Sequence, residues 1–406
     1  RRASGFSLTA ALGRFTQHHG RAILVVTVII TGLAVAGIAR LRVENSFIDY
    51  FKSSTEIYQG MQLIDRKLGG TTSLDVIIRF DDIDLAQFAD PEEEEDPFAS
   101  VYGKKTAEDY NKYWFFDERL KTIERVHDYL DELPGTGKVL SLATLLKIGR
   151  ILNDGKSLES IEMAVLYTKL PDEYKKLIVW PYLSIENNEA RFWLRIIDSL
   201  PDLNRDALLK QIKQELTAEV GLAPDRVRLA SFMVLYNNYL QSLFSSQIKT
   251  LGFVALALLA MFLVLFRSLT LAFIALFPNL LSAAAVISVM GWLGIPLDMM
   301  TITIAAISIG IAVDDTIHYI YRFREEIKVD GDYVQAMHRC HGSIGRAMYY
   351  TSVTIIIGFS ILALSNFWPT IYFGLFTGLA MLVALIAALT LLPQLIVWLR
   401  PFRVSA

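Results

Sequence analysis

The chain has 406 residues, of which 53% are hydrophobic and 20% are charged, with a formal net charge of −3. This slightly acidic balance argues against nucleic acid as a partner, and the absence of a Walker-type glycine loop argues against an ATP-driven machine. The hydrophobic residues gather in long runs with little or no charge, which is typical of an integral membrane protein.

Six stretches are each long and apolar enough to cross a bilayer. A helix rises about 1.5 Å per residue, so roughly 20 apolar residues cross about 30 Å of hydrocarbon. We predict a bundle of six transmembrane helices over residues 22–40, 249–266, 270–293, 299–321, 347–366 and 371–398, with an amphipathic lead-in (1–21), a loop (322–346) and a tail (399–406).

The basic residues predict the orientation of this bundle. Lys and Arg flank the spans on one side, whereas the short loops 294–298 and 367–370 on the other side carry neither. Because basic residues in short loops remain in the cytoplasm, both termini and the loop 322–346 are predicted to be cytoplasmic. The only cysteine, Cys340, falls in that loop, so no disulfide is available to the domain between the first two spans.

That domain, residues 41–248, is polar and is predicted to lie outside the membrane. Residues 40–249 hold 27 basic and 35 acidic side chains, so the outer part is acidic. Strand-like alternation and helical periodicity follow one another twice, which predicts an α+β domain made of two small sandwiches. The expected elements are helices over 56–67, 117–133 and 205–220 and strands over 73–80, 190–197 and 226–230.

Three features of this domain bear on its role. The acidic, proline-bounded run 90–97 could bind a cation or a basic partner, but a solvated loop is the better interpretation. The apolar surface of 117–133 and 139–151 could line a hydrophobic substrate cleft, but ordinary core or subunit packing is the better interpretation. A helical pattern over 232–244 leads towards the second span, so it could transmit domain motion to the membrane.

The fourth span contains the ionisable residues that are candidates for function. It contains Asp314 and Asp315, each of which costs roughly 2.5–3.5 kcal/mol near the bilayer centre, so such acids are functional candidates. His318 follows within one helical turn of both. Thr301, Ser308 and Asp315 recur every seven residues and form a polar stripe. Two adjacent carboxylates do not both ionise cheaply in a pocket of low dielectric constant, so one of them is expected to keep a proton that an isolated Asp would lose. A proton carrier requires a group that binds and releases a proton in this way.

The fifth span offers hydroxyl groups that could act with these acids. Thr351, Ser352 and Thr354 either relay a proton or simply hydrogen-bond neighbouring helices. A metal site built on Asp314, Asp315 and His318 would need a further ligand from another helix, and the spans supply no suitable Cys or His. We therefore predict a proton relay at Asp314 and Asp315, candidate partners His318, Ser308, Thr351 and Thr354, and no metal or organic cofactor.

The topology and several motifs resemble one half of a transporter of the resistance-nodulation-division superfamily, closest to the MMPL-like branch of lipid and hydrophobe exporters. The resemblance covers essentially the whole chain, and its most specific part is Gly310-x-x-x-Asp314-Asp315. Supporting motifs are Asp315-Thr-Ile-His318, Tyr321-Arg-Phe-Arg-Glu-Glu326, Gly345-Arg-Ala-Met-Tyr-Tyr-Thr351-Ser352, Gly358-Phe359 and Leu392-Pro393.

The resemblance implies a porter-type periplasmic domain inserted between the first two helices, in a bacterial inner membrane. It also implies that Asp314 and Asp315 carry protons while outer domains take substrate from the outer leaflet or periplasm. The chain departs from the family in having one motif and no internal repeat. We therefore expect a six-span half, such as the C-terminal half of a longer polypeptide, that works with a second half in the same chain or in an oligomer.

The function expected from these features is secondary active transport, not enzymatic catalysis. The leading hypothesis is proton-driven export of a hydrophobic or amphipathic substrate, a lipid in particular. Whether a periplasmic partner protein takes part is left open. One alternative is a drug or small-organic efflux pump in a tripartite complex, although such pumps usually have larger outer domains. Another is a non-transporting membrane scaffold with a sterol-sensing type of bundle.

Overall fold

The structure is a computed structural model that describes residues 8–41, 46–82, 114–115, 117–156, 160–200, 203–218 and 220–402. The acidic run 90–97, residues 1–7 of the lead-in and residues 403–406 of the tail lie outside the described residues. The chain divides into two units, Glu56–Asn238 and the remainder, Arg1–Thr55 with Tyr239–Ala406. Each unit is described by itself.

The larger unit contains the membrane-spanning helices. Within the described residues, six helical segments are long and apolar enough to cross a membrane, which confirms the predicted number. The helix α10 begins at Phe232, so the helical pattern noted at 232–244 and the second span form one continuous helix. The main helices are α1 (Leu8–Ile38), α10 (Phe232–Phe266), α11 (Leu269–Leu293), α12 (Ile304–Asp330), α14 (Ile344–Ser360), α15 (Trp368–Leu389) and α16 (Leu391–Leu399); the shorter ones are η1 (Ile48–Tyr50), η5 (Thr301–Thr303), α13 (Tyr333–Gly342) and η6 (Ile361–Leu364).

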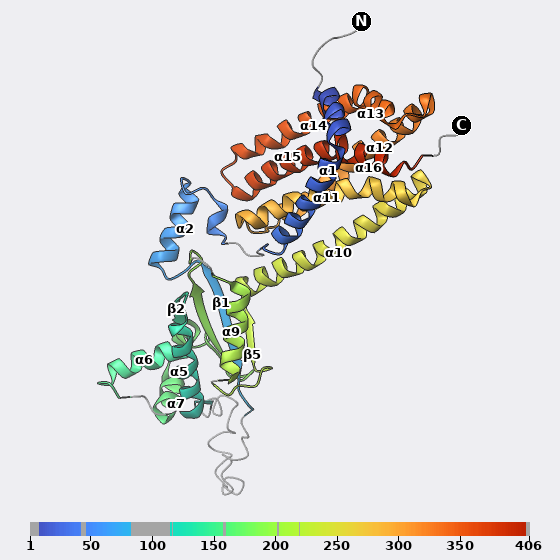
Figure 1. Cartoon of the computed structure of the whole chain (residues 1–406). Coiled ribbons are helices and arrows are strands. Elements are labelled where there is room, and N and C mark those ends of the chain that lie inside the picture. Colours follow the sequence, from blue (N-terminus) through green and yellow to red (C-terminus); the bar gives the residue numbers. More distant parts are fainter. Residues whose placement is uncertain are drawn as a thin grey trace, which may run out of the picture. The chain divides into compact units, whose positions relative to one another are not determined.

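The helices α11 and α15 are the most buried of the six spans and pack against each other (Figure 1). The helix α1 packs on α11 at a contact made by two glycines. A Cβ atom placed on Gly291 would lie 1.9 Å from the carbonyl oxygen of Gly37, and one placed on Gly37 would lie 2.6 Å from the carbonyl oxygen of Ser288. Small residues let helix backbones approach closely, which favours association in lipid.

This contact predicts that Gly37→Ala weakens the fold. The added methyl group would push α1 away from α11, and such overpacking costs about 1–3 kcal/mol of the free energy of unfolding. Gly32→Ala is the matched control, because Gly32 lies on the same helix and has no atom within 4 Å of its Cβ position. Denaturant unfolding in detergent micelles measures both variants. Equal stability of the two variants would contradict the close-contact interpretation.

Two spans are interrupted. The helix α1 has non-helical backbone angles at His19 (φ −118°, ψ 26°), which divides the lead-in from the membrane span. The last span breaks at Thr390 (φ −125°, ψ −60°), between α15 and α16. Pro393 explains this second break, because it has no N–H to give to the carbonyl of Leu389 and its ring collides with that carbonyl in a regular helix.

The described part of the smaller unit is built on one antiparallel sheet. The strands lie in the order β2-β4-β1-β5, with β3 paired to β4, so the predicted pair of sandwiches was wrong. The first predicted round supplies β1 and the second supplies β4 and β5, and β1 pairs directly with both. The strands are β1 (Thr72–Arg79), β2 (Thr136–Leu140), β3 (Leu183–Ser184), β4 (Glu189–Ile196) and β5 (Val227–Ala230).

Helices cover this sheet and bury its apolar side. Alternate residues of β4 are buried along its whole length, as the period of two requires. The apolar surface predicted over 117–133 belongs to α5, and its residues Leu120, Ile123, Val126 and Leu130 are buried in the same core. The helices of the unit are α2 (Glu56–Lys67), α5 (Asp117–Glu132), α6 (Leu142–Leu152), α7 (Ser160–Lys169), α8 (Asp172–Ile178) and α9 (Arg205–Ala218).

A buried carboxylate fixes α2 to the sheet. Asp65, which is fully buried, accepts hydrogen bonds from the backbone N–H and hydroxyl of Thr71 and from the backbone N–H groups of Asp198 and Ser199, all at 2.8–2.9 Å. Burial alone would raise the pKa of Asp65, but the hydrogen bonds from Ser199, Asp198 and Thr71 outweigh burial and lower it below its ordinary value.

Asp65→Asn is therefore expected to lower the free energy of unfolding of this region by about 1–3 kcal/mol, because an N–H₂ group replaces the oxygen that accepts from Ser199 and the other hydrogen bonds lose their charged acceptor. With the folded-state pKa lowered, the carboxylate contributes fully above the ordinary Asp pKa of about 4, and the contribution is lost as pH falls through the lowered value. Hydrogen exchange of the Asp198 and Ser199 amides in the full chain measures the loss. Exposed Asp225→Asn is the control; similar exchange in both variants would refute the assignment.

Candidate functional site

The helix α12 has two different faces. Thr301, at the turn before α12, and Ser308 and Thr316 on α12 are buried in the bundle, whereas Gly310, Asp314 and His318 are exposed. These last three residues are spaced by four, so they lie along one side of the helix. The predicted site therefore sits where the exposed side of α12 meets its buried side.

The exposed side carries an ion pair. His318 Nε2 lies 3.4 Å from Asp314 Oδ1, and the two side chains are 60% and 75% exposed. Asp314 lies about 20 Å along the helix from Thr301, well inside the span. Because charged groups in hydrocarbon are costly, this side of α12 requires protein or water against it when the chain is in a membrane.

Asp315 turns towards the bundle. It is partly buried, and its carboxyl group faces Ser352 of α14, which is buried. One repeat of seven earlier, Ser308 is fully buried, and its hydroxyl has no hydrogen-bond partner among the described residues. The stripe predicted from Thr301, Ser308 and Asp315 thus follows the inner side of α12, with Asp315 at its margin.

The two predicted threonine partners lie elsewhere. The hydroxyl of Thr351 donates to the carbonyls of Ala347 and Met348, and that of Thr354 donates to the carbonyl of Tyr350. Both threonines are on the exposed side of α14, and their hydroxyl groups find hydrogen-bond acceptors within that helix. The hydroxyl of α14 on the side of Asp315 is that of Ser352, one residue away from the predicted Thr351, and it makes no hydrogen bond among the described residues.

A polar clamp formed by Asn279 and Thr316 lies next to Asp315 in the sequence and was not predicted from it. Asn279 of α11 donates through Nδ2 to the carbonyl of Ala275 at 2.8 Å and to Thr316 Oγ1 at 3.1 Å, while Thr316 Oγ1 lies 3.3 Å from Asn279 Oδ1. Asn279 and Thr316 are both buried. The clamp joins α11 to α12 at the residue after the acid pair. A lone Asn within an apolar run was the available signal.

A second missed acid, Asp298, lies in the turn that precedes η5 and α12. Asp298 Oδ1 accepts from the backbone N–H groups of Met300 and Thr301 at 2.8 Å and from the Thr301 hydroxyl at 3.1 Å. Its burial raises the pKa of Asp298 above its ordinary value, although these hydrogen bonds work in the opposite direction. Asp and Thr three residues apart before a helix are a capping pattern, so this signal was available in the sequence.

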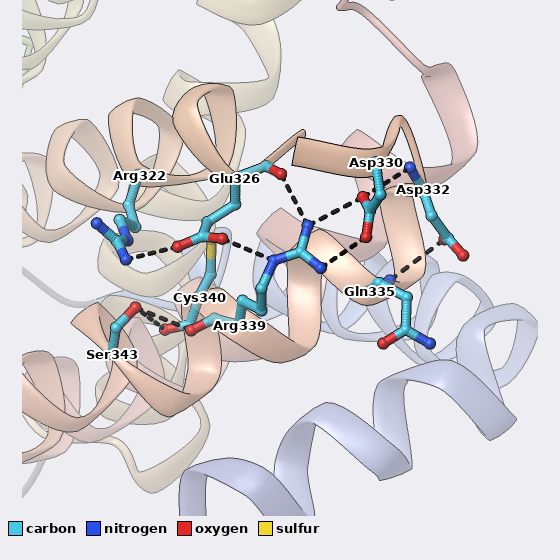
Figure 2. Close-up of polar contacts among 8 residues, drawn as sticks. All are labelled: Arg322, Glu326, Asp330, Asp332, Gln335, Arg339, Cys340 and Ser343. Carbon is cyan, nitrogen blue, oxygen red and sulfur yellow. Dashed lines mark hydrogen bonds and ion pairs between the residues drawn. The ribbon is translucent and has the colours of Figure 1, made fainter. Parts of the chain in front are cut away.

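An ion-pair network joins the end of α12 to α13 (Figure 2). Glu326, nearly buried, accepts from Arg322 at 2.5 Å and from Arg339 at 2.6 Å, and Arg339 also binds Asp330 at 2.7 Å. The hydrogen bonds to Asp330 and Glu326 raise the pKa of Arg339. Cys340 is buried beside Glu326, and this burial raises the pKa of its thiol to about 12, so the thiol stays protonated.

No group of three or more His, Cys, Asp and Glu side chains that could hold a metal ion occurs in the part of the chain that the structure describes. The site itself offers carboxyl, imidazole and hydroxyl groups. Asp314, Asp315 and His318 can each bind and release a proton.

The fold and site define a polytopic membrane protein with ionisable groups inside a span. The sequence pattern of the MMPL family matches residues 183–405, more than half of the chain, and the chain belongs to this family. A membrane protein of Methanocaldococcus jannaschii is 21% identical over 394 residues, which cover 95% of this chain and 92% of that protein. A membrane protein of Streptomyces coelicolor is 34% identical over 92 residues, or 22% of this chain and 13% of that protein.

The network in Figure 2 predicts that Glu326→Gln destabilises the attachment of α13. Removing the charge leaves Arg322 and Arg339 without their shared anion, which costs about 1–3 kcal/mol in the free energy of unfolding. Glu325→Gln is the control, because the neighbouring Glu325 is exposed and its pair with exposed Lys328 contributes little to stability. Denaturant unfolding in micelles compares the two; equal losses would contradict the bridging role.

Proposed function

We propose that this protein is a proton-motive-force-driven transporter of the resistance-nodulation-division type that moves a hydrophobic or amphipathic substrate, a lipid in particular. The observation that carries the proposal is the placement of Asp314 and Asp315 within one span of an MMPL-family chain, one turned out with His318 and the other turned in against Ser352. A change in protonation at this pair would act on both sides of α12.

Energetics support a transport role for the pair. Two acids in a span together cost several kcal/mol, and intramembrane acids mark proton relays and substrate pathways. A purely structural role would be served by a buried, fully hydrogen-bonded group such as Asn279, which the neighbouring helix already supplies. Asp314 has no such packing, since 75% of its side chain is exposed.

The exposed pair also supports a second six-span half. Covering the side of α12 that bears Gly310, Asp314 and His318 would remove the charges from lipid. Thr351 and Thr354 of α14 are likewise exposed and would be covered in the same way if the partner extended over α14. The second half is another copy of this chain or a further part of the same polypeptide, and protons would pass at the junction.

The surface of the smaller unit supports the proposal of a hydrophobic substrate. Ile151, Leu152 and Leu177 are 77%, 80% and 72% exposed, so apolar side chains of α6 and α8 are available at its surface. Apolar side chains exposed in this way are suited to contact a lipid or another protein. In the proposed orientation both termini are cytoplasmic, the membrane is the bacterial inner membrane, and the smaller unit works in the periplasm, with or without a periplasmic partner.

Asp315→Asn and Asp314→Asn are each expected to reduce proton-coupled transport to background. The assay uses proteoliposomes of the host's own lipids with an imposed pH gradient, and it follows internal pH with a trapped dye and lipid exposure with an impermeant label. Glu325→Gln, an exposed acid on the same helix beyond the pair, should keep wild-type rates. Full transport by Asp314→Asn would sink the proposal, and neutral effects at both positions would favour the scaffold function.

A further inference from the structure

The sheet of the smaller unit has two unlike faces. In β1 the side chains of Leu74, Val76 and Ile78 are buried in the core together with residues of α5 and α9. The side chains between them lie on the opposite face of the strand and are only partly buried. The strand β4 alternates in the same way along its whole length. We call this second, partly buried side of the sheet the open face.

The strand register identifies the residues that share the open face. Residues directly opposite each other in an antiparallel pair lie on the same face of a sheet. Trp193 of β4 lies opposite Leu140 of β2 and Asp75 of β1. Two residues further along β4, Arg195 lies opposite Lys138 of β2. The open face therefore carries an apolar row, Leu140 and Trp193, next to a basic row, Lys138 and Arg195.

The open face is basic although the region around it is acidic. Residues 40–249 hold more acidic than basic side chains. On the open face, by contrast, the described strands place five basic side chains, those of Arg79, Lys138, Arg191, Arg195 and Arg228, and two acidic ones, those of Asp75 and Glu189. A surface with this local excess of positive charge is complementary to an anion.

Two of these basic residues already have an acidic partner. Arg191 Nε lies 2.9 Å from Asp75 Oδ1, and Arg228 pairs with Glu189. With both acids of the open face engaged in this way, neither is left over for the basic row.

The basic row has no such partner. Lys138 and Arg195 face each other and form no ion pair among the described residues. Arg195 Nη1 donates to the carbonyl of Leu68 at 3.3 Å, and its guanidinium carbon lies 5.1 Å from the centroid of the Trp193 ring. Like charges directly opposite each other destabilise a sheet. An anion bound between Lys138 and Arg195 would offset this repulsion.

The apolar row determines what kind of anion fits. Residues two apart on a strand are roughly 7 Å apart, so the ring of Trp193 and the side chain of Leu140 adjoin the two cations. Both side chains are only partly buried. A small inorganic anion would contact the basic row alone, whereas an amphipathic anion would use both rows.

We propose that the open face binds a lipid with an anionic headgroup. Headgroup oxygens accept charge-assisted hydrogen bonds from Lys138 and Arg195, and the adjoining apolar part of the lipid lies against Trp193 and Leu140. The inference rests on the proposed function, because it names anionic lipids as the substrate class of the transporter.

The first test detects a lipid at Trp193 in the full chain, kept in a neutral detergent. Short-chain phosphatidylglycerol with brominated acyl chains quenches a tryptophan that it touches, and the difference from Trp193→Phe isolates Trp193 among the six tryptophans. We expect binding about tenfold tighter than that of brominated phosphatidylcholine with the same chains, because only the anionic lipid gains the ionic hydrogen bonds. Inorganic phosphate at equal concentration should not displace it.

The second test removes the two charges. Lys138→Gln combined with Arg195→Gln should raise the Kd for phosphatidylglycerol about tenfold or more. The same variant relieves the repulsion between the strands, so its thermal midpoint should equal or exceed that of the wild type. The matched control is Lys121→Gln combined with Lys210→Gln, which removes two exposed charges from α5 and α9 and should leave lipid binding unchanged.

Three outcomes would overturn the inference. The first is equal quenching by the two lipids, or unchanged binding in the Lys138 and Arg195 variant. The second is displacement by inorganic phosphate, which would make the face a site for simple anions. The third is a second copy of the chain on this face, shown by native mass spectrometry if the wild type is a dimer that does not bind the lipid and the charge variant is a monomer.

Lipid binding is measured without a pH gradient, so this inference and the proposed function fail separately. If Asp315→Asn abolishes transport but phosphatidylglycerol does not reach Trp193, the inference fails and the transporter proposal stands. If phosphatidylglycerol binds at Trp193 but Asp315→Asn keeps full transport, the proposed function fails. The open face would then be a lipid-binding surface that serves another process.

Discussion

The cost of an unsatisfied polar group in hydrocarbon is the constraint on which the membrane unit depends. Lipid offers no hydrogen bonds, so each buried polar group needs a partner from the protein. Thr27 and Thr31 of α1 donate to carbonyls of their own helix, and Asn279 binds Thr316 across two helices. The Asp314–His318 pair stands apart because it is largely exposed. The same rule marks the pair as a site, and it also marks the buried hydroxyls of Ser308 and Ser352, which have no hydrogen-bond partner among the described residues.

The constraint acts on the backbone as well as on side chains. Pro393 breaks the last span and leaves the Leu389 carbonyl without its helical donor, and a histidine 48 residues earlier in the chain supplies one. Because His341 also contacts Tyr319, the break in one span is connected to the helix that carries the acids. A local defect in α15 therefore fixes the position of α13, and the ion pairs of Arg339 reinforce that position.

Sequence periodicity predicted what depends on neighbours along the chain. The length of the apolar runs predicted the six spans, and the apolar pattern of α5 predicted which side of that helix is buried. The spacing of Asp314 and His318 predicted that their side chains meet. Pairing between distant segments was not predictable in this way. The strand β1 pairs with residues more than a hundred positions later, so two local rounds of strand and helix looked like two domains when they form one sheet.

The same limit applies to the site. A seven-residue repeat places Ser308 and Asp315 on one side of α12, but the choice among neighbouring hydroxyls of α14 depends on the rotation of that helix. Ser352 rather than Thr351 turns inwards because α14 packs on α15 along a close backbone contact at Gly374, where a Cβ atom would lie 2.5 Å from the carbonyl of Phe359. Rotation about a helix axis is a tertiary property, and a rotation of 100° exchanges adjacent residues.

Unequal anchoring of α12 suggests how a proton could have a mechanical effect. Asp298 holds the turn before the helix, and the helix itself is bound to α11 through Asn279 and to α13 through Glu326. Towards α14, by contrast, the group facing Asp315 is the small hydroxyl of Ser352. Gain or loss of charge at Asp315 would change this contact more easily than the anchored ones, so α14, together with α15, is the element best placed to respond. Because α15 ends at the carbonyl that His341 holds, a response there would be transmitted back to α12 through Tyr319.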